Sequence, residues 1–200
     1  MKTKNSPRVI FTVVCLITMI ANYALRPSMA LAFAGSGQLT FARHVTINGN
    51  NAVSGQTVFD GNRIKVGGKG TAIINLGKSG RIELGANSEM ALFVSGNNLS
   101  GTLMSGCLAV NAPAGESVEI NTPKGKISSA SNQPTSFFIG FKGNSANIFP
   151  NLGEIKVSAD SKVENAKRGD LITLTSGPNG ISSLKRLAKG ACGDSGAMCA

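Results

Sequence analysis

Residues 71–84 read TAIINLGKSGRIEL and contain two apolar stretches joined by a short polar linker. In the second stretch, Arg81 to Leu84, charged and aliphatic residues alternate, so the charges fall on one face of an extended chain and the aliphatic side chains on the other. The linker Lys78-Ser79-Gly80 consists of residues that permit a tight turn. The segment therefore predicts two paired strands, each with one buried and one solvated face.

The same pattern continues along the chain from Gln38 onward. Gly, Asn, Pro and Ser interrupt the apolar runs at intervals of roughly 8–12 residues, the spacing typical of antiparallel sandwiches and rolls. The 25 Gly residues also disfavour long helices, because Gly in a helix interior costs about 1 kcal/mol. The strands are expected at Leu39–Ile47, Arg63–Val66, Thr71–Leu76, Arg81–Leu84, Met90–Val94, Leu103–Val110, Val118–Ile120, Phe137–Phe141, Ala146–Phe149, Ile155–Val157 and Leu171–Leu174.

The fold class that follows is all-β, with short Gly-rich antiparallel strands in a sandwich or β-roll. A solenoid-like β-helix is the alternative. Turns are expected at Asp60-Gly61-Asn62, Gly67-Gly68 and Gly96-Asn97-Asn98, among others, because these residues tolerate a positive φ. A short helix is a further expectation for Ser182–Lys189, with Gly190 ending it.

The N-terminus has the three parts of a secretory signal peptide. Basic residues precede an uncharged run, Val9–Ala21, and small residues follow it in the sequence SMALAFA. We expect cleavage after Ala34 or, alternatively, after Ala32. An uncleaved anchor is less favoured, because 13 apolar residues fall short of the roughly 20 that span a bilayer. The chain is thus divided into a signal peptide (1–34), a β domain (35–180) and a C-terminal tail (181–200), and the product is expected to be periplasmic or extracellular with no membrane span.

Removing the signal changes the charge and the aromatic content. The net charge falls from +10 to +6, because Lys2, Lys4, Arg8 and Arg26 leave and 16 basic residues remain against 10 acidic ones. The only Tyr, Tyr23, leaves as well, and the chain has no Trp. Proteins that bind single-stranded nucleic acid stack bases on aromatic rings beside a basic groove. The remaining composition therefore argues against a nucleic-acid partner.

The central part of the chain resembles the FecR-type envelope domain, named for regulators of iron-citrate uptake. The resemblance extends over roughly 48–175 and includes Val118–Gly125, Ile155–Val157 and Ala166–Asp170. Its most specific positions are Val53, Gly55, Val58, Asp60-Gly61, Arg63-Ile64, Gly70-Thr71-Ala72, Ile74, Leu76, Ile82, Leu84-Gly85 and Asn87-Ser88. The resemblance implies an all-β domain that acts through interactions in the bacterial envelope.

The sequence departs from that family pattern in three places. Lys78-Ser79-Gly80 stands where the family has an Asp-Gly-Ser turn, and Asn132–Ser136 replaces an Arg-Gly-Thr element. Only eight residues precede the apolar run, whereas the family's regulators carry a cytoplasmic segment that contacts a sigma factor. We therefore expect a stand-alone exported form without the sigma-regulating segment.

No motif in the sequence indicates catalysis. Residues 72–79 match a relaxed P-loop pattern, but a P-loop leads into a helix, whereas Gly80 precedes another expected strand. His44 is the only histidine, has no recognisable nucleophile partner and is expected to be a polar surface residue. Acid pairs such as Glu116 and Glu119 lack the aromatic platforms that usually accompany sugar sites. We expect neither enzyme activity, nor a metal, nor a cofactor.

The cysteines suggest one disulfide. Cys192 and Cys199 are separated by a flexible loop containing Gly193 and Gly196, and an oxidising compartment would let them pair. Cys107 lies in an apolar run and is interpreted as a buried small hydrophobic residue.

The function expected from the sequence is a non-enzymatic interaction or scaffold module of the envelope with a protein partner. The candidate contact positions are the polar turns at Asn97, Asn98, Lys124 and Lys126. The alternative is a binder of anionic envelope polysaccharide or lipopolysaccharide, whose affinity would fall steeply with salt.

Overall fold

The fold is known from a computed structural model that describes residues 37–130, 132–160, 162–176 and the backbone of 182–187. These residues form sixteen strands and one short 3-10 turn, η1, at Gly77–Ser79. The strands are β1 (Gly37–Ile47), β2 (Asn50–Asn51), β3 (Thr57–Val58), β4 (Arg63–Asn75), β5 (Arg81–Leu84), β6 (Glu89–Ser95), β7 (Asn98–Ser105), β8 (Cys107–Ala112), β9 (Ser117–Thr122), β10 (Gly125–Ser129), β11 (Thr135–Lys142), β12 (Ser145–Leu152), β13 (Glu154–Ala159), β14 (Lys162–Lys167), β15 (Leu171–Ser176) and β16 (Ser182–Leu187). The expected all-β fold is confirmed.

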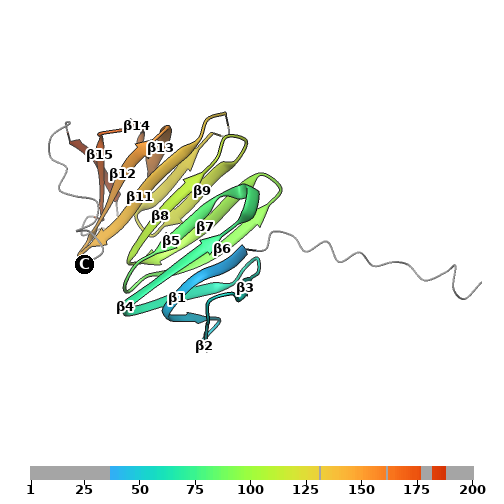
Figure 1. Cartoon of the computed structure of the whole chain (residues 1–200). Helices are drawn as coiled ribbons and strands as arrows, with labels where there is room; N and C mark the ends of the chain where they lie inside the picture. The colour runs from blue at the N-terminus through green and yellow to red at the C-terminus, as the bar shows by residue number, and fades with distance from the viewer. Residues whose placement is uncertain (1–36, 131, 161, 177–181, 188–200) are drawn as a thin grey trace, which may run out of the picture. The chain divides into compact units, whose positions relative to one another are not determined.

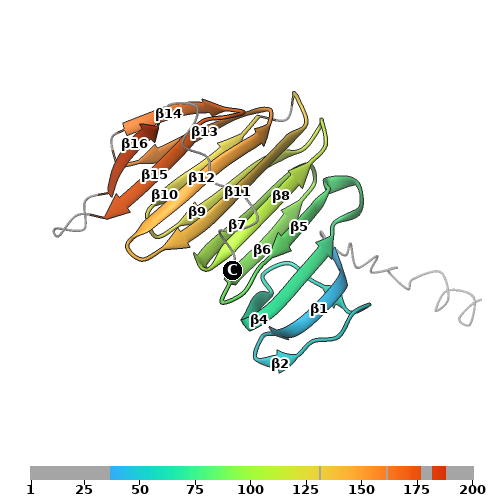
Figure 2. The same ribbon diagram turned by 60° about the vertical axis from the view of Figure 1, so that its left-hand side comes forward.

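The strands stack in two layers (Figure 1). One layer has the order β5-β8-β11-β12-β15-β16 and the other has the order β6-β7-β9-β10-β13-β14. Apart from the parallel pair β7 and β9, the neighbours are antiparallel. The chain alternates between the layers as it proceeds, so each new hairpin extends the sandwich at one end (Figure 2). The strands of both layers belong to one continuous sheet that folds over on itself, in keeping with the expected all-β class.

Strand β4 joins the layers, because its first residues pair with β6 and its last residues pair with β5. The sequence interpretation placed a turn at Gly67-Gly68 and two separate strands around it, which is wrong. The strand is continuous because β1 pairs with it on both sides of the glycines, Val45 opposite Val66 and Arg43 opposite Thr71. Four residues of β4 therefore lie opposite one residue of β1, a bulge with more than the usual single extra residue, which bends the strand.

The core fills the space between the layers and is composed of the inward residues of each strand. Its largest members with no exposed surface include Ile82 on β5, Met90 on β6, Leu108 on β8 and Phe137 on β11. In β6 the residues alternate buried and exposed, as the period of two in its sequence predicts. The outer faces of the layers are therefore the surfaces available for function.

The helix expected at Ser182–Lys189 is wrong, because Ser182–Leu187 forms strand β16. All six of its residues pair with Leu171–Ser176 of β15. An isolated helix needs roughly 12–15 residues to be stable in water, whereas the open edge of β15 offers backbone partners to an extended chain. Within the described ranges, no helix has the length and apolar character needed to cross a bilayer.

Candidate functional site

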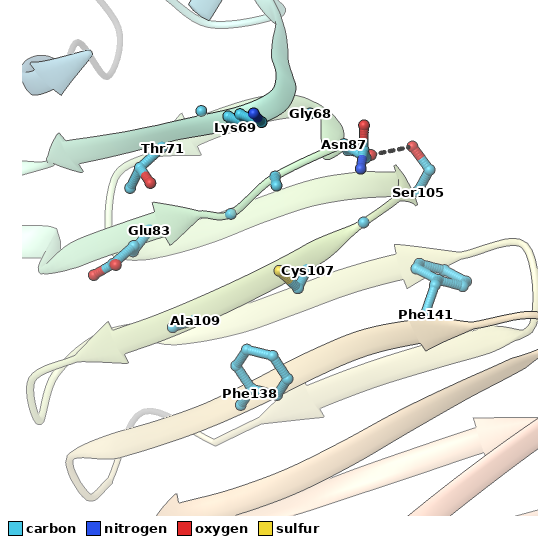
Figure 3. Close-up of a pocket in the computed structure, with 14 residues that line it drawn as sticks. Gly68, Lys69, Thr71, Glu83, Asn87, Ser105, Cys107, Ala109, Phe138 and Phe141 are labelled. Carbon is cyan, nitrogen blue, oxygen red and sulfur yellow. Dashed lines mark hydrogen bonds between the residues drawn. The ribbon is translucent and has the colours of Figure 1, made fainter. Parts of the chain in front are cut away.

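A groove with a volume of about 690 Å³ lies where the bulged part of β4 meets strands β5, β8 and β11 (Figure 3). Glu83 on β5, Ala109 on β8 and Phe138 on β11 point to the outer face, since their neighbours Leu84, Leu108 and Ile139 are buried in the core. The groove is lined by Gly68, Lys69, Gly70, Thr71, Glu83, Gly85, Ala86, Asn87, Ser105, Gly106, Cys107, Ala109, Phe138 and Phe141.

The polar side of the groove is formed by the bulge of β4 and the segment after β5. Lys69 is exposed, and Gly70 beside it is buried with its backbone directly against that of Arg43. Asn87 has a φ of 56°, and its backbone N–H donates a hydrogen bond to the backbone carbonyl of Gly67 at 3.2 Å. This bond fixes the bulge against the neighbouring loop, so the ammonium of Lys69 projects from a defined piece of backbone.

The floor of the groove is held by Ser88, which has no exposed surface. Its hydroxyl accepts a hydrogen bond from the Cys107 amide at 2.8 Å and donates one to the Cys107 carbonyl at 2.9 Å. The same carbonyl accepts from the Gly85 amide at 3.1 Å. Ser105 adds a bond from its hydroxyl to the Asn87 carbonyl at 3.1 Å (Figure 3).

The apolar side of the groove is formed by Ala109, Phe138 and Phe141. Cys107 lies between the two sides and is 2% exposed, which confirms the expected burial. The interpretation of Cys107 as merely a small hydrophobic residue is incomplete, because its sulfur is disulfide-bonded. The cysteines named in the sequence prediction, Cys192 and Cys199, lie outside the described residues.

The groove offers one positive and one negative side chain for recognition. Glu83 is half-buried and pairs with Arg81 at 3.5 Å, an exposed contact that contributes little stability. His44 is exposed at the bulge and lines a shallow neighbouring recess with Gly67, Gly68 and Lys69. In the described part of the chain, no group of three His, Cys, Asp or Glu residues is arranged to hold a metal ion. The groove is therefore equipped for binding through shape, apolar contact and a few charges.

The polar turns selected from the sequence lie elsewhere and at opposite ends of β9. Asn97 and Asn98 adjoin its first residue, because the Ser117 amide donates to the Asn97 carbonyl at 2.9 Å and the Ser117 hydroxyl bonds the Asn98 side chain at 3.2 Å. Lys124 lies two residues beyond the last residue of β9, and its ammonium donates to the Asn144 side chain at 2.7 Å. Lys126 pairs with Glu119 at 2.8 Å. At about 3.4 Å per residue, the two ends of β9 are roughly 17 Å apart.

The structure assigns a role to residues that the sequence pattern marked only as part of a resemblance. Gly85 and Asn87 line the groove, and the buried Ser88 supports it from beneath through its bonds to Cys107. The P-loop-like segment ends in η1 and leads into β5, so it lacks the helix that a phosphate loop needs. The sequence analysis did not select Lys69 as a candidate site residue. A lysine between glycines does not show that the strand forms a bulge there, or that the bulge places the side chain at the edge of a groove.

The fold is similar to that of two crystal structures of a candidate anti-sigma factor from Parabacteroides distasonis, determined at 1.65 and 2.50 Å resolution. Each superposes with a TM-score of 0.51 and 14% sequence identity, over 64% of this chain and 60% of the other. The chain thus spans less than two thirds of the length of those structures. No family model and no curated protein sequence matches the chain. The likeness shows a shared all-β fold.

Proposed function

We propose that this protein is an exported interaction module of the bacterial envelope, related to the FecR-type domain, that binds a segment of a partner protein in the groove beside the β4 bulge. The observation that carries the proposal is the groove itself, which combines an apolar wall of Ala109, Phe138 and Phe141 with the charged groups of Lys69 and Glu83. Protein segments present this same mixture of apolar side chains, amides and charges.

Three further observations support the proposal. The first 34 residues have the pattern of a signal peptide, which would deliver the domain to the envelope. The fold is similar to that of a protein described as a candidate anti-sigma factor, a name that denotes a regulator of another protein. The groove backbone is fixed by the hydrogen bonds of Ser88 and Asn87, and a fixed site loses little entropy when a partner binds.

Site-specific photo-crosslinking in the producing cell tests the proposal. A photoreactive phenylalanine analogue at position 69, on the rim of the groove, should capture a discrete envelope protein. The same analogue at position 93 is the matched control, because Phe93 is exposed on the outer face of the other layer. An added Ala109→Arg substitution, which fills the apolar wall, should abolish capture from position 69.

Two outcomes would contradict the proposal. Equal capture from positions 69 and 93, or capture that survives Ala109→Arg, would remove the groove as the binding site. Retention of the purified protein on lipopolysaccharide or cell-wall polysaccharide, with an affinity that collapses as salt rises, would favour an anionic polymer as the partner instead.

A further inference from the structure

The bulge of β4 gathers basic side chains at one end of the groove. Lys69 lies within the bulge and lines both the groove and the shallow recess beside it (Figure 3). His44 on β1 lines the same recess. Arg43 lies directly opposite Thr71 in the register of β1 and β4, so it shares the outer face with that groove residue. We call Arg43, His44 and Lys69 the basic rim.

The positive charge of the basic rim has no acidic partner. All three side chains are exposed, and in the ranges that the structure describes none of them forms an ion pair. Glu83, the acidic residue that lines the groove, is already paired with Arg81 at 3.5 Å. Arg43 and Lys69 are cationic at neutral pH, and His44 adds a ring N–H donor. The basic rim is therefore equipped to receive negative charge from another molecule.

The glycines of the bulge give the basic rim its shape. In the described ladder of β4, no residue from Gly67 to Gly70 is paired with a residue of β1, β5 or β6. A Cβ added at Gly67 would lie 3.3 Å from the Cβ of His44, closer than an ordinary van der Waals contact. The missing side chain at Gly67 thus leaves room for His44 and Lys69 to line one recess of about 370 Å³.

The character of the surface changes from the basic rim to the apolar wall. Glu83 on β5 is paired with Ile73, which lies two residues, or about 7 Å, along β4 from Thr71. Ala109 on β8 is paired with Glu83 on the side away from β4. A ligand that crosses these strands therefore meets basic groups first, then one carboxylate, and then an apolar wall.

This order of groups distinguishes between two kinds of anionic ligand. A polymer with a negative group on each repeating unit would place one of those groups close to Glu83, where like charges repel. A peptide carries its acidic and apolar side chains at separate positions, so it can match the basic rim and the apolar wall together. The charge pattern therefore favours a peptide.

We propose that the partner segment in the groove is an acidic peptide, whose Asp or Glu carboxylates contact the basic rim and whose neighbouring apolar side chains lie against Ala109. The guanidinium of Arg43 can bond a carboxylate through two parallel N–H groups, and the ammonium of Lys69 adds a second charge. These contacts speed the encounter and fix the direction in which the peptide lies. This inference rests on the proposed function and names the chemistry of its partner.

Selection from a phage-displayed library of random peptides tests the inference, with the protein purified from the producing cell as bait. We expect enriched peptides that combine Asp or Glu with apolar residues and that no longer bind when Ala109→Arg fills the apolar wall. Enriched peptides without acidic residues, if blocked by Ala109→Arg, would overturn the acidic partner and leave the groove as the binding site. Peptides that bind the Ala109→Arg variant normally would instead contradict the groove itself.

Charge reversal locates the carboxylates of the peptide. The double variant Arg43→Glu with Lys69→Glu should bind a synthetic enriched peptide about tenfold more weakly in fluorescence anisotropy at low salt, because like charges then face each other. A second peptide, with Lys in place of each acidic residue, should bind this variant more tightly than it binds the wild type.

Lys156→Glu with Lys162→Glu is the matched control for the charge reversal. Both lysines are exposed, on β13 and β14, and their replacement changes the net charge by the same amount. The control should bind the acidic peptide nearly as tightly as the wild type does. Equal weakening in the two double variants would show that the overall charge, and not the basic rim, attracts the peptide, and would overturn the inference.

Retention on purified lipopolysaccharide separates the peptide from an anionic polymer. If the library yields no peptide, the acidic partner is overturned. Retention that the Arg43→Glu, Lys69→Glu variant then loses would assign the basic rim to an anionic polymer instead. Photo-crosslinking from position 69 reports on the groove independently, because Arg43 and His44 remain in that variant. Failure of that capture would contradict the proposed function, whereas failure of the charge reversal contradicts only the acidic partner.

Discussion

The hydroxyl of Ser88 bonds both backbone polar groups of Cys107, accepting from the amide at 2.8 Å and donating to the carbonyl at 2.9 Å. A single side chain thereby takes the place of a strand partner at the start of β8. Ser88 is completely buried, and water has no access to either bond. One buried hydroxyl group therefore ties the segment after β5 to the backbone of the disulfide-bonded Cys107.

Replacing Ser88 with Ala should lower the free energy of unfolding by about 1–3 kcal/mol, the cost of leaving a buried donor without a partner. The Cys107 carbonyl keeps the Gly85 amide, so the loss falls mainly on the Cys107 amide. Urea denaturation followed by far-UV circular dichroism measures the effect, since the chain after residue 34 has no Trp or Tyr to report by fluorescence.

Ser105→Ala is the matched control, because it removes one exposed bond to the Asn87 carbonyl. Its cost should stay below about 1 kcal/mol. Equal decreases in the free energy of unfolding of the two variants would show that burial of the Ser88 hydroxyl does not increase its contribution to stability.

Replacing Gly106 with Ala should prevent stable folding. The residue has a φ of 81°, and an added Cβ would lie 2.6 Å from the Ser88 amide nitrogen, inside any allowed contact. The clash is with backbone and cannot be relieved by a side-chain rotation. Gly96→Ala separates the two causes, because Gly96 has a φ of 60° but open space around its Cα. The free energy of unfolding of the Gly96→Ala control should fall by only about 1–2 kcal/mol, the cost of placing a residue with a Cβ in the left-handed conformation. A stable, fully folded Gly106→Ala variant in thermal denaturation would refute the assigned contact.

The strands were predictable where their side chains alternate, as in Arg81–Leu84, because a period of two requires one buried face. The extended conformation of Gly67–Gly70 was not predictable, because glycines indicate a turn when only the local sequence is considered. Pairing with β1 on both sides of this segment keeps the chain extended. The tail strand β16 was missed for the same reason, because its partner β15 is a tertiary feature.

The candidate site was only partly visible in the sequence. Asn87 and Ser88 stood out as part of a motif, but nothing in the order of residues shows that the Ser88 hydroxyl meets a backbone 19 residues away. The apolar wall was hidden because Phe137 and Phe138 are adjacent phenylalanines, and the strand sends one into the core and the other to the outer face. Which surface is hollow depends on the packing of four separate segments.

Two phenylalanines allow the core to be tested directly. Phe137 has no exposed surface and packs between the layers, whereas Phe93 is 45% exposed. Phe137→Ala should reduce the free energy of unfolding by about 3–5 kcal/mol, through lost burial and the cavity that remains. Phe93→Ala removes the same atoms from the surface and should cost well under half as much. Chemical denaturation of both variants measures the difference, and similar losses would contradict the placement of Phe137 between the layers.

The bulge of β4 predicts a difference between neighbouring glycines. A Cβ at Gly70 would clash with the Arg43 carbonyl and lie 2.7 Å from the Val66 side chain, although the backbone there is not left-handed. Gly70→Ala should therefore push β1 and β4 apart, lower the stability by several kcal/mol, and displace Lys69 at the groove rim. Gly68→Ala is the control, since its Cβ would meet only the Asn87 side-chain oxygen at 3.4 Å, an ordinary contact. Amide hydrogen exchange of the Arg43–Val45 segment, measured in both variants, should speed up in Gly70→Ala alone, because opening the bulge exposes the β1 backbone to solvent. Equal exchange in the two variants would show that β1 does not lie against Gly70.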